Sequence, residues 1–396
     1  SRTMQTFDAL RAWLNEQATN KVYGASAAVS VRGERIFTGF AGFSDADGRC
    51  QGGAATVFRL ASMTKPITAA AIMLCLQRGL LRLDDDVSDY IPAFREMYVA
   101  EKTQNGWARG RRAGPLTLRR LLTHTSGLGS GAYGDSVYGS IKPHPGDTLQ
   151  TAVGRYAGCL LDFMPGMAQH YSAVLAFDVL AAVVERVTGT KYGTFVKEEI
   201  FLPLGMEHTG YRLSEFPPSE LAVTCACKDG VLTPEPLNSA FEDFPDGYTG
   251  GGAGLLSSLG DYMLFAEELL RALAGKGRIL SRESVAEMSR PQLGKNIEGI
   301  SDYYNWGFGV RALAAQCEWQ PLPAGSFGWS GAYGTHFWVD PAGGTVAVYM
   351  HNSRTFGGAG APHTLEFERL VTDSLGRGFT RAEKSGSFAI GEGLVP

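Results

Sequence analysis

A serine and a lysine stand three positions apart at the head of an apolar run, and this pattern restricts the chain more than any other. The stretch RLASMTKPITAAAIMLCL, residues 59–76, contains Ser62 and Lys65. Proline lacks an amide hydrogen and fits only near the start of a helix, so Pro66 predicts a helix that begins at about Ser62. Residues three apart share one helix face. The amine of Lys65 can therefore reach the hydroxyl of Ser62.

A hydroxyl beside an amine is the arrangement of a nucleophile and its base, and a helix N-terminus favours developing negative charge. The S-x-x-K pattern is weak alone, since a chain of 396 residues should contain about one by chance. The apolar run strengthens it, because a lysine that faces this run is buried. Burial lowers the pKa of an amine and makes it a usable base.

The charge balance argues against large charged partners. Forty acidic and thirty-six basic residues give a net charge of -4, without a long run of one sign. We therefore expect a small or neutral ligand and no nucleic-acid or membrane partner. The longest apolar stretch, 67–76, is about half of a membrane span, and no leader pattern is seen at Ser1.

Cysteine and histidine spacing gives no sign of a metal site. The six cysteines include no CxxC pair, which favours a reducing compartment and a cytoplasmic location. The histidines show no H-E-x-x-H or comparable spacing, so we expect no metal.

The glycine-dense stretch GYTGGGAGLL lacks the G-K-[ST] ending of a nucleotide loop. We expect no cofactor.

The two ends of the chain predict one antiparallel sheet flanked by terminal helices. Apolar residues recur at helical spacing from Phe7 to Leu14, and SAAVSVRGERIFTGFAG, from Ser26, reads as a hairpin. The stretch FGWSGAYGTHFWVDPAGGTVAVYMHN, from Phe327, adds two or three strands, and the pattern in APHTLEFERLVTDSL adds a helix. Strands and helices at both ends indicate a shared sheet with helices packed on it.

The middle of the chain has a mostly helical pattern of apolar residues. PLTLRRLLTHTSG and SAVLAFDVLAAVVERVTG have helical period and end at Gly127 and Gly189, a common helix stop. We therefore predict an α/β fold with a discontinuous sheet domain, 1–81 and 241–396, and a mostly helical domain, 82–240. The site is expected in the cleft between them.

Motifs in a fixed order show a family resemblance. SMTK, LLTHTSGLG, YSA, GGGAGLLSS and WSGAYG follow one another along the chain. This set resembles the serine β-lactamase and penicillin-binding-protein superfamily. It resembles more closely the family VIII carboxylesterases, which are built like class C β-lactamases but cleave esters. The likeness runs from about Val22 to Leu375.

The resemblance implies a role for each matching position. Ser62 would be the acylated nucleophile, Lys65 its base partner and Tyr171 the proton shuttle to the leaving group. The backbone N–H groups of Ser62 and Ala332 would form the oxyanion hole. The edge-strand motif Trp329, Ser330 and Gly331 would line the site.

Two aromatic residues are candidates for an acyl pocket. Tyr133 follows the HTSGLG motif closely, and Tyr248 stands beside the glycine patch. Pockets for small ligands are lined mainly by aromatic and apolar side chains. We predict that both rings line the pocket of a small-molecule ester.

Two departures from the family pattern favour esters over penicillins. In β-lactamases and DD-peptidases the tyrosine motif usually ends in asparagine and the edge strand begins with lysine or histidine. Here these places hold Ala173 and Trp329. Without the asparagine amide and without the lysine or histidine cation, the site should bind penicillins more weakly. The acylation chemistry should remain intact.

The expected function is therefore ester hydrolysis through an acyl-Ser62 intermediate, with three alternatives. An acyltransferase would pass the acyl group to an alcohol, and product analysis with a competing alcohol distinguishes it. A β-lactamase or DD-peptidase is disfavoured by the two departures. A non-catalytic binding protein would turn over no activated ester.

Overall fold

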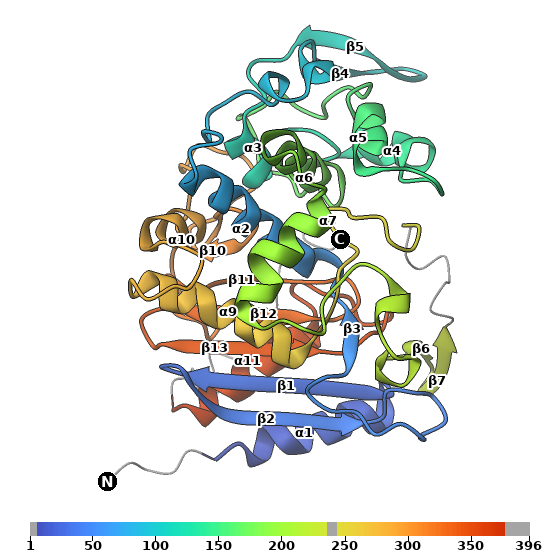
Figure 1. The fold of residues 1–396 in the computed structure, drawn as a ribbon, viewed down its shortest axis with the longest axis vertical. Helices are drawn as coiled ribbons and strands as arrows, with labels where there is room; N and C mark the ends of the chain where they lie inside the picture. The colour runs from blue at the N-terminus through green and yellow to red at the C-terminus, as the bar shows by residue number, and fades with distance from the viewer. Residues whose placement is uncertain (1–5, 236–243, 377–396) are drawn as a thin grey trace.

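One antiparallel sheet joins the two ends of the chain. The structure, a computed structural model, describes residues 6–235 and 244–376. Its largest sheet has the strand order β2-β1-β13-β12-β11-β10-β9 (Figure 1). The strands are β1 (Gly24–Val31), β2 (Glu34–Gly42), β9 (Tyr304–Trp306), β10 (Arg311–Leu313), β11 (Phe327–Ser330), β12 (His336–Asp340) and β13 (Thr345–Met350). Ser26 on β1 lies opposite Met350 on β13, which confirms the predicted sharing of one sheet.

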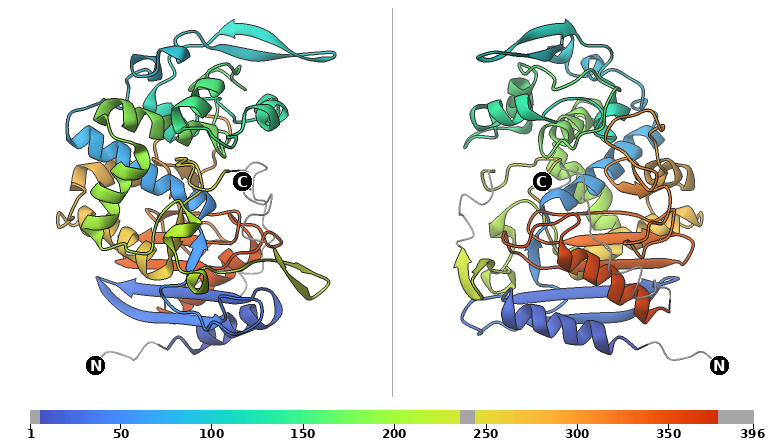
Figure 2. Two further views of the ribbon diagram at one scale, coloured as in Figure 1. Left: turned by 45° about the vertical axis from the view of Figure 1, so that its right-hand side comes forward. Right: turned by 180° about the vertical axis from the view of Figure 1, so that it is seen from behind.

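Helices cover both faces of this sheet. The helices α1 (Asp8–Asn20) and α11 (Pro362–Ser374) lie on one face and α9 (Leu259–Leu273) on the other (Figures 1 and 2). Neighbouring residues of β12 point to opposite faces. Phe337 packs on Tyr262 of α9, with ring centroids 5.0 Å apart, whereas Trp338 packs on Phe367 of α11 at 5.3 Å. The sheet is therefore buried on both sides.

The remaining elements lie mainly beyond the α9 face. The helices are α2 (Thr64–Gln77), α3 (Leu118–Leu122), α4 (Ala132–Ile141), α5 (Leu149–Tyr156), α6 (Leu175–Thr188), α7 (Tyr192–Val196), α8 (Leu202–Leu204) and α10 (Arg282–Ser289). The strand pairs are β3 (Val57–Arg59) with β8 (Leu256–Ser258), β4 (Tyr98–Thr103) with β5 (Gly106–Arg112), and β6 (Thr224–Lys228) with β7 (Val231–Glu235). Figure 1 shows α3, α5, α6 and the β4–β5 hairpin at the end far from α1.

The described residues contain neither a disulfide nor a helix suited to crossing a membrane. All six cysteines are described and all six are free. Across residues 6–235 and 244–376, no helix has the length and apolar character needed to cross a membrane.

Two sequence predictions about the middle segment need correction. The helix expected to end at Gly127 is α3, which ends at Leu122, because His124 adopts a left-handed φ of 57° that interrupts it. The strand β6 was assigned to the helical domain, yet the N–H of Cys225 donates to Asn352 O (3.1 Å), at the end of β13. This hairpin therefore lies against the sheet. The predicted boundary at 240/241 falls outside the described residues.

The glycine-dense stretch serves close backbone packing against α6. A Cβ on Gly251 would lie 2.2 Å from Phe177 O, and a Cβ on Gly252 would lie 2.8 Å from Val174 O. Real Cβ atoms do not approach backbone oxygens so closely, so only glycine fits here. The observed packing explains these glycines without a nucleotide.

We expect Gly251→Ala to destabilise the protein, because the added methyl group collides with the backbone oxygen of Phe177. This oxygen can move only if the surrounding helix α6 moves as well. Overpacking of this kind costs about 2 kcal/mol or more. Thermal unfolding followed by circular dichroism should give a Tm several degrees lower. Gly53→Ala is the matched control, because no heavy atom lies within 4 Å of the Cβ position. Equal Tm values for the two variants would contradict this account of the glycine patch.

Candidate active site

A sharp strand-to-helix turn presents Ser62 at the head of α2. β3 ends at Arg59, a 3₁₀ turn spans Ala61–Met63, and α2 follows from Thr64. Ala61 has a φ of 47°, which is uncommon for a residue other than glycine and marks a strained turn. The Nζ atom of Lys65 lies 3.1 Å from Ser62 Oγ, and both side chains are buried. The contact expected from their spacing is present.

The amine of Lys65 is held by two backbone carbonyls in addition to Ser62. It lies 2.6 Å from Ala173 O and 2.8 Å from Gly252 O. A neutral amine has two hydrogens and one lone pair. The carbonyls can only accept and therefore use both hydrogens, so the lone pair faces the Ser62 hydroxyl. After gaining a proton, the amine still has an acceptor for each of its three hydrogens.

Burial controls the protonation state of this site. It lowers the pKa of Lys65 to about 7, and the carboxylate of Asp178 opposes this shift. Burial also raises the pKa of Tyr171, while its hydrogen bonds with Ser62 and Trp329 oppose the rise. Near neutral pH, a large share of Lys65 is therefore a free base and Tyr171 remains a phenol able to donate a proton.

Tyr171 completes a chain of hydrogen bonds through Ser62. Its hydroxyl donates to Ser62 Oγ at 2.6 Å and accepts from Trp329 Nε1 at 3.1 Å. The Trp329 side chain is 1% exposed, and its ring centroid lies 5.2 Å from that of Tyr171. This indole therefore does more than replace the cation of the family pattern, because its N–H holds the Tyr171 hydroxyl.

The strand that carries Trp329 is β11, and it is not at the sheet edge as predicted. β10 and β9 lie beyond it. Because side chains alternate along a strand, Ser330 points away from the face that Trp329 occupies. The Ser330 hydroxyl lies 2.6 Å from His336 Nδ1 and is buried. The Ser330 hydroxyl thus already has a partner within the protein, and its contact with substrate stays a prediction.

Gly331 and Ala332 form the turn after β11. A Cβ on Gly331 would lie 2.2 Å from Leu60 O, so glycine allows this turn to approach the segment that carries Ser62. Gly331 N donates to Thr335 O (2.9 Å), and Gly334 N donates to Gly331 O (2.9 Å). Ala332 is half-buried within this turn. Its part in an oxyanion hole stays a prediction.

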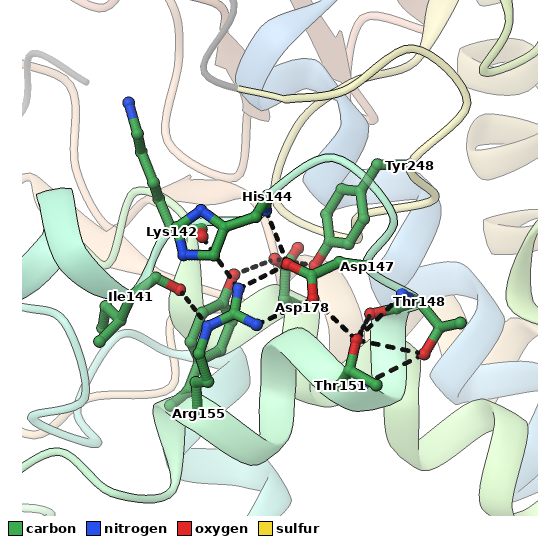
Figure 3. Close-up of polar contacts among 10 residues, drawn as sticks. Ile141, Lys142, His144, Asp147, Thr148, Thr151, Arg155, Asp178 and Tyr248 are labelled. Carbon is green, nitrogen blue, oxygen red and sulfur yellow. Dashed lines mark hydrogen bonds and ion pairs between the residues drawn. The ribbon is translucent and has the colours of Figure 1, made fainter.

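The two aromatic pocket candidates have other partners. The hydroxyl of Tyr248 donates to Asp178 Oδ2 at 2.9 Å, and its side chain is 6% exposed. Figure 3 shows Tyr248 directed at Asp178, beside the ion pair of Arg155 with Asp147. The hydroxyl of Tyr133 accepts from Leu160 N at 3.1 Å. Contact of either ring with an acyl chain stays a prediction.

Sequence reasoning missed several residues around Tyr171. The ring of His124 lies 4.6 Å from the Tyr171 ring, and that of Trp306 lies 4.5 Å from His124 and 4.6 Å from Trp329. The LLTHTSGLG motif was the available signal for His124. Nothing local marked Trp306, which comes from the edge strand β9. Within the described part of the chain, no group of three or more His, Cys, Asp or Glu residues is placed to bind a metal.

Comparison with known proteins identifies the family. The family model described as Beta-lactamase matches residues 5–368. This chain belongs to the beta-lactamase family. As a member of the beta-lactamase family, it is 33% identical to esterase EstB of Burkholderia gladioli over 383 residues, which is 89% of this chain and 91% of EstB.

Two solved structures share the fold of this chain. The structure of "EstCE1, a hydrolase with promiscuous acyltransferase activity" has a TM-score of 0.76 and 25% identity, and covers 93% of this chain and 98% of EstCE1. Simvastatin synthase (LovD) of Aspergillus terreus has a TM-score of 0.77 and 23% identity, and covers 94% of this chain and 98% of LovD. The latter similarity concerns the fold alone.

We expect modification of Ser62 by a neutral phosphonate ester to slow below about pH 7. Protonation of Lys65, whose pKa burial lowers to about 7, removes the lone pair that faces the hydroxyl. The rate should then fall about tenfold for each further pH unit and level off above the pKa. Inactivation kinetics between pH 5 and 9 measure this, with reagent hydrolysis as the blank. A rate that stays constant down to pH 5 would argue against a lysine base.

Proposed function

We propose that this protein is a carboxylesterase that works through an acyl-Ser62 intermediate, with Lys65 as base and Tyr171 as proton donor. One observation carries the proposal. Ser62 Oγ lies between a buried amine at 3.1 Å and a phenol at 2.6 Å. Nucleophile, base and acid are thus in direct contact before substrate arrives. The 33% identity to esterase EstB supports an ester as substrate.

Acylation begins with transfer of the Ser62 proton to Lys65, directly or through Tyr171. Ser62 Oγ forms a bond to the ester carbonyl carbon, and the carbonyl electron pair moves onto the oxygen. The N–H groups of Ser62 and Ala332 are the proposed donors to this oxyanion, each typically worth about 3 kcal/mol. When the C–O bond to the alcohol breaks, Tyr171 gives its proton to the leaving alkoxide and recovers one from Lys65.

Deacylation repeats these steps with water as the nucleophile. Water loses a proton to the same base and attacks the acyl carbon. The bond to Ser62 Oγ then breaks, and Ser62 regains its proton. The buried carbonyls of Ala173 and Gly252 remain bonded to Lys65 in both of its protonation states. The amine can therefore accept and release a proton repeatedly without losing a partner.

The residues beside Tyr171 favour neutral esters over penicillins. Trp329 stands where related β-lactamases have a cation, and Ala173 offers a methyl group and a carbonyl already bonded to Lys65. A penicillin carboxylate next to an indole would lose water without gaining a charged partner. Desolvation of an unpaired carboxylate costs several kcal/mol.

Acyl transfer to an alcohol is the second candidate function. EstCE1, which is 25% identical and aligns with 93% of this chain, is described as a hydrolase with promiscuous acyltransferase activity. The same acyl-Ser62 intermediate serves both reactions, and only the acceptor differs. The ratio of transesterified to hydrolysed product in the presence of a competing alcohol separates them.

Ser62→Ala should abolish hydrolysis of p-nitrophenyl acetate, with a loss of about four orders of magnitude or more. The protein should remain folded, because this short side chain contributes little to packing, and circular dichroism checks this. Mass spectrometry of the parent protein treated with a phosphonate should find the adduct on Ser62. Ser289→Ala on α10 is the matched control and should retain activity. An adduct on Ser126 or Ser330 would overturn the assignment.

Trp329→Lys combined with Ala173→Asn should move the specificity towards penicillins. The lysine supplies a cation for the carboxylate, and ester turnover should fall because the Trp329 N–H bond to Tyr171 is lost. The measurement is the ratio of kcat/KM values for a chromogenic cephalosporin and p-nitrophenyl acetate. Trp329→Phe is the control: it loses the N–H without adding charge, so ester turnover should fall about tenfold with no gain on the cephalosporin. An unchanged ratio in the double variant would exclude Trp329 as a selector.

A further inference from the structure

The histidine of the LLTHTSGLG motif, His124, is buried and has no contact with Ser62 in the proposed mechanism. Its side chain is fully buried, and its backbone has a left-handed φ of 57°. A left-handed conformation is costly for most residues and persists only where the surroundings enforce it. A buried histidine in a strained conformation requires a physical explanation beyond packing.

His124 holds the backbone on both sides of Tyr171. The N–H of His170 donates to His124 O at 3.0 Å. The N–H of Ser172 donates to the ring nitrogen Nδ1 of His124 at 3.0 Å. Two hydrogen bonds from the residues on either side of one position restrict the orientation of the residue between them. That residue is Tyr171.

The imidazole also limits the position of the Tyr171 ring. Their centroids are 4.6 Å apart, and Trp329 packs on Tyr171 with a centroid distance of 5.2 Å. The Nζ atom of Lys65 lies 4.8 Å from the centre of the Tyr171 ring. The ring therefore has defined neighbours as well as a fixed backbone, and its hydroxyl reaches Ser62 Oγ at 2.6 Å.

The same motif secures the next residue of the chain. The Ser172 hydroxyl donates to Leu128 O at 2.7 Å and accepts from Ala176 N at 3.1 Å. Ala173 then presents its carbonyl to Lys65 at 2.6 Å. The segment that contains His124 thus determines the placement of groups that contact both Ser62 and Lys65.

The bond to Ser172 defines the chemical state of the imidazole. A ring nitrogen that accepts an amide hydrogen carries none itself, so the neutral ring has its hydrogen on Nε2. Burial lowers the pKa of His124 well below its usual value, which keeps Nδ1 available as an acceptor. Among the described residues, Nε2 has no hydrogen-bond partner, so the bond from Ser172 is the polar contact that holds the ring.

We propose that His124 is a positioning residue for the reaction: its Nδ1 bond to Ser172 N–H and its contact with the Tyr171 ring hold the Tyr171 hydroxyl on Ser62. This inference rests on the proposed function, in which Tyr171 transfers protons. Misplacement of a catalytic group by about 1 Å can lower turnover about 100-fold. His124 should therefore act on kcat rather than on KM.

The test compares two replacements of nearly equal shape. In His124→Asn, Oδ1 can take the place of Nδ1 as acceptor, and asparagine tolerates a positive φ. In His124→Leu, the acceptor is lost. With p-nitrophenyl acetate as substrate, we expect the leucine variant to lose about 100-fold in kcat with little change in KM, and the asparagine variant to stay within about fivefold of the parent. His144→Leu and His144→Asn are matched controls on an exposed histidine outside this arrangement and should retain activity.

A double-mutant cycle separates positioning from loss of fold. Tyr171→Phe should lower kcat strongly, and adding His124→Leu to it should lower kcat by less than about threefold, because the hydroxyl that His124 positions is already absent. Tm values report folding for each variant. A full 100-fold loss from His124→Leu in the Tyr171→Phe background would overturn the inference. If the leucine variant does not fold, a folded His124→Asn with a 100-fold loss in kcat would overturn it equally.

The outcomes also distinguish this inference from the proposed function. A Tyr171→Phe variant with parental kcat would contradict the role of Tyr171 and hence the proposed mechanism. A strong effect of Tyr171→Phe with no effect of His124→Leu would leave the mechanism standing and refute the positioning role alone.

Discussion

The amine of Lys65 is removed from water, and the site is organised around its need for partners. An amine buried without hydrogen bonds would cost several kcal/mol. Its three acceptors come from three separate segments: Ser62 from the turn before α2, Ala173 from the approach to α6, and Gly252 from the glycine patch. All three must be in place for the amine to be satisfied. The requirements of burial and those of proton transfer thus select the same geometry.

The second consequence of burial is the connected set of polar groups beyond Lys65. Trp329 N–H, the Tyr171 hydroxyl and Ser62 form a continuous chain of hydrogen bonds in a nearly dry environment. Hydrogen bonds strengthen where water is excluded, but each unsatisfied group there becomes expensive. In this chain the Trp329 indole and the Ala173 carbonyl each hold one member of this set, the Tyr171 hydroxyl and the Lys65 amine respectively.

Much of the fold could be predicted from local patterns. The terminal helices, the β1–β2 hairpin and the end of α6 at Gly189 follow from hydrophobic period and turn residues, which depend on near neighbours in the chain. The end of α3 could not be predicted, because the left-handed His124 that interrupts the helix has a distant partner: Ser172, 48 positions away, donates its N–H to Nδ1. The position of β11 inside the sheet likewise depends on strands β9 and β10, whose short segments carry weak patterns.

For the site, the sequence by itself determined the pairing of Ser62 with Lys65, since three residues on a helix fix which side chains share a face. The motifs further indicated Tyr171 and Trp329 as their companions. Only the tertiary structure decided the contacts of the site. The Trp329 N–H donates to the Tyr171 hydroxyl, the Ser330 hydroxyl bonds His336, and backbone carbonyls hold the Lys65 amine. These contacts join segments far apart in the chain, so they depend on how the sheet and helices pack.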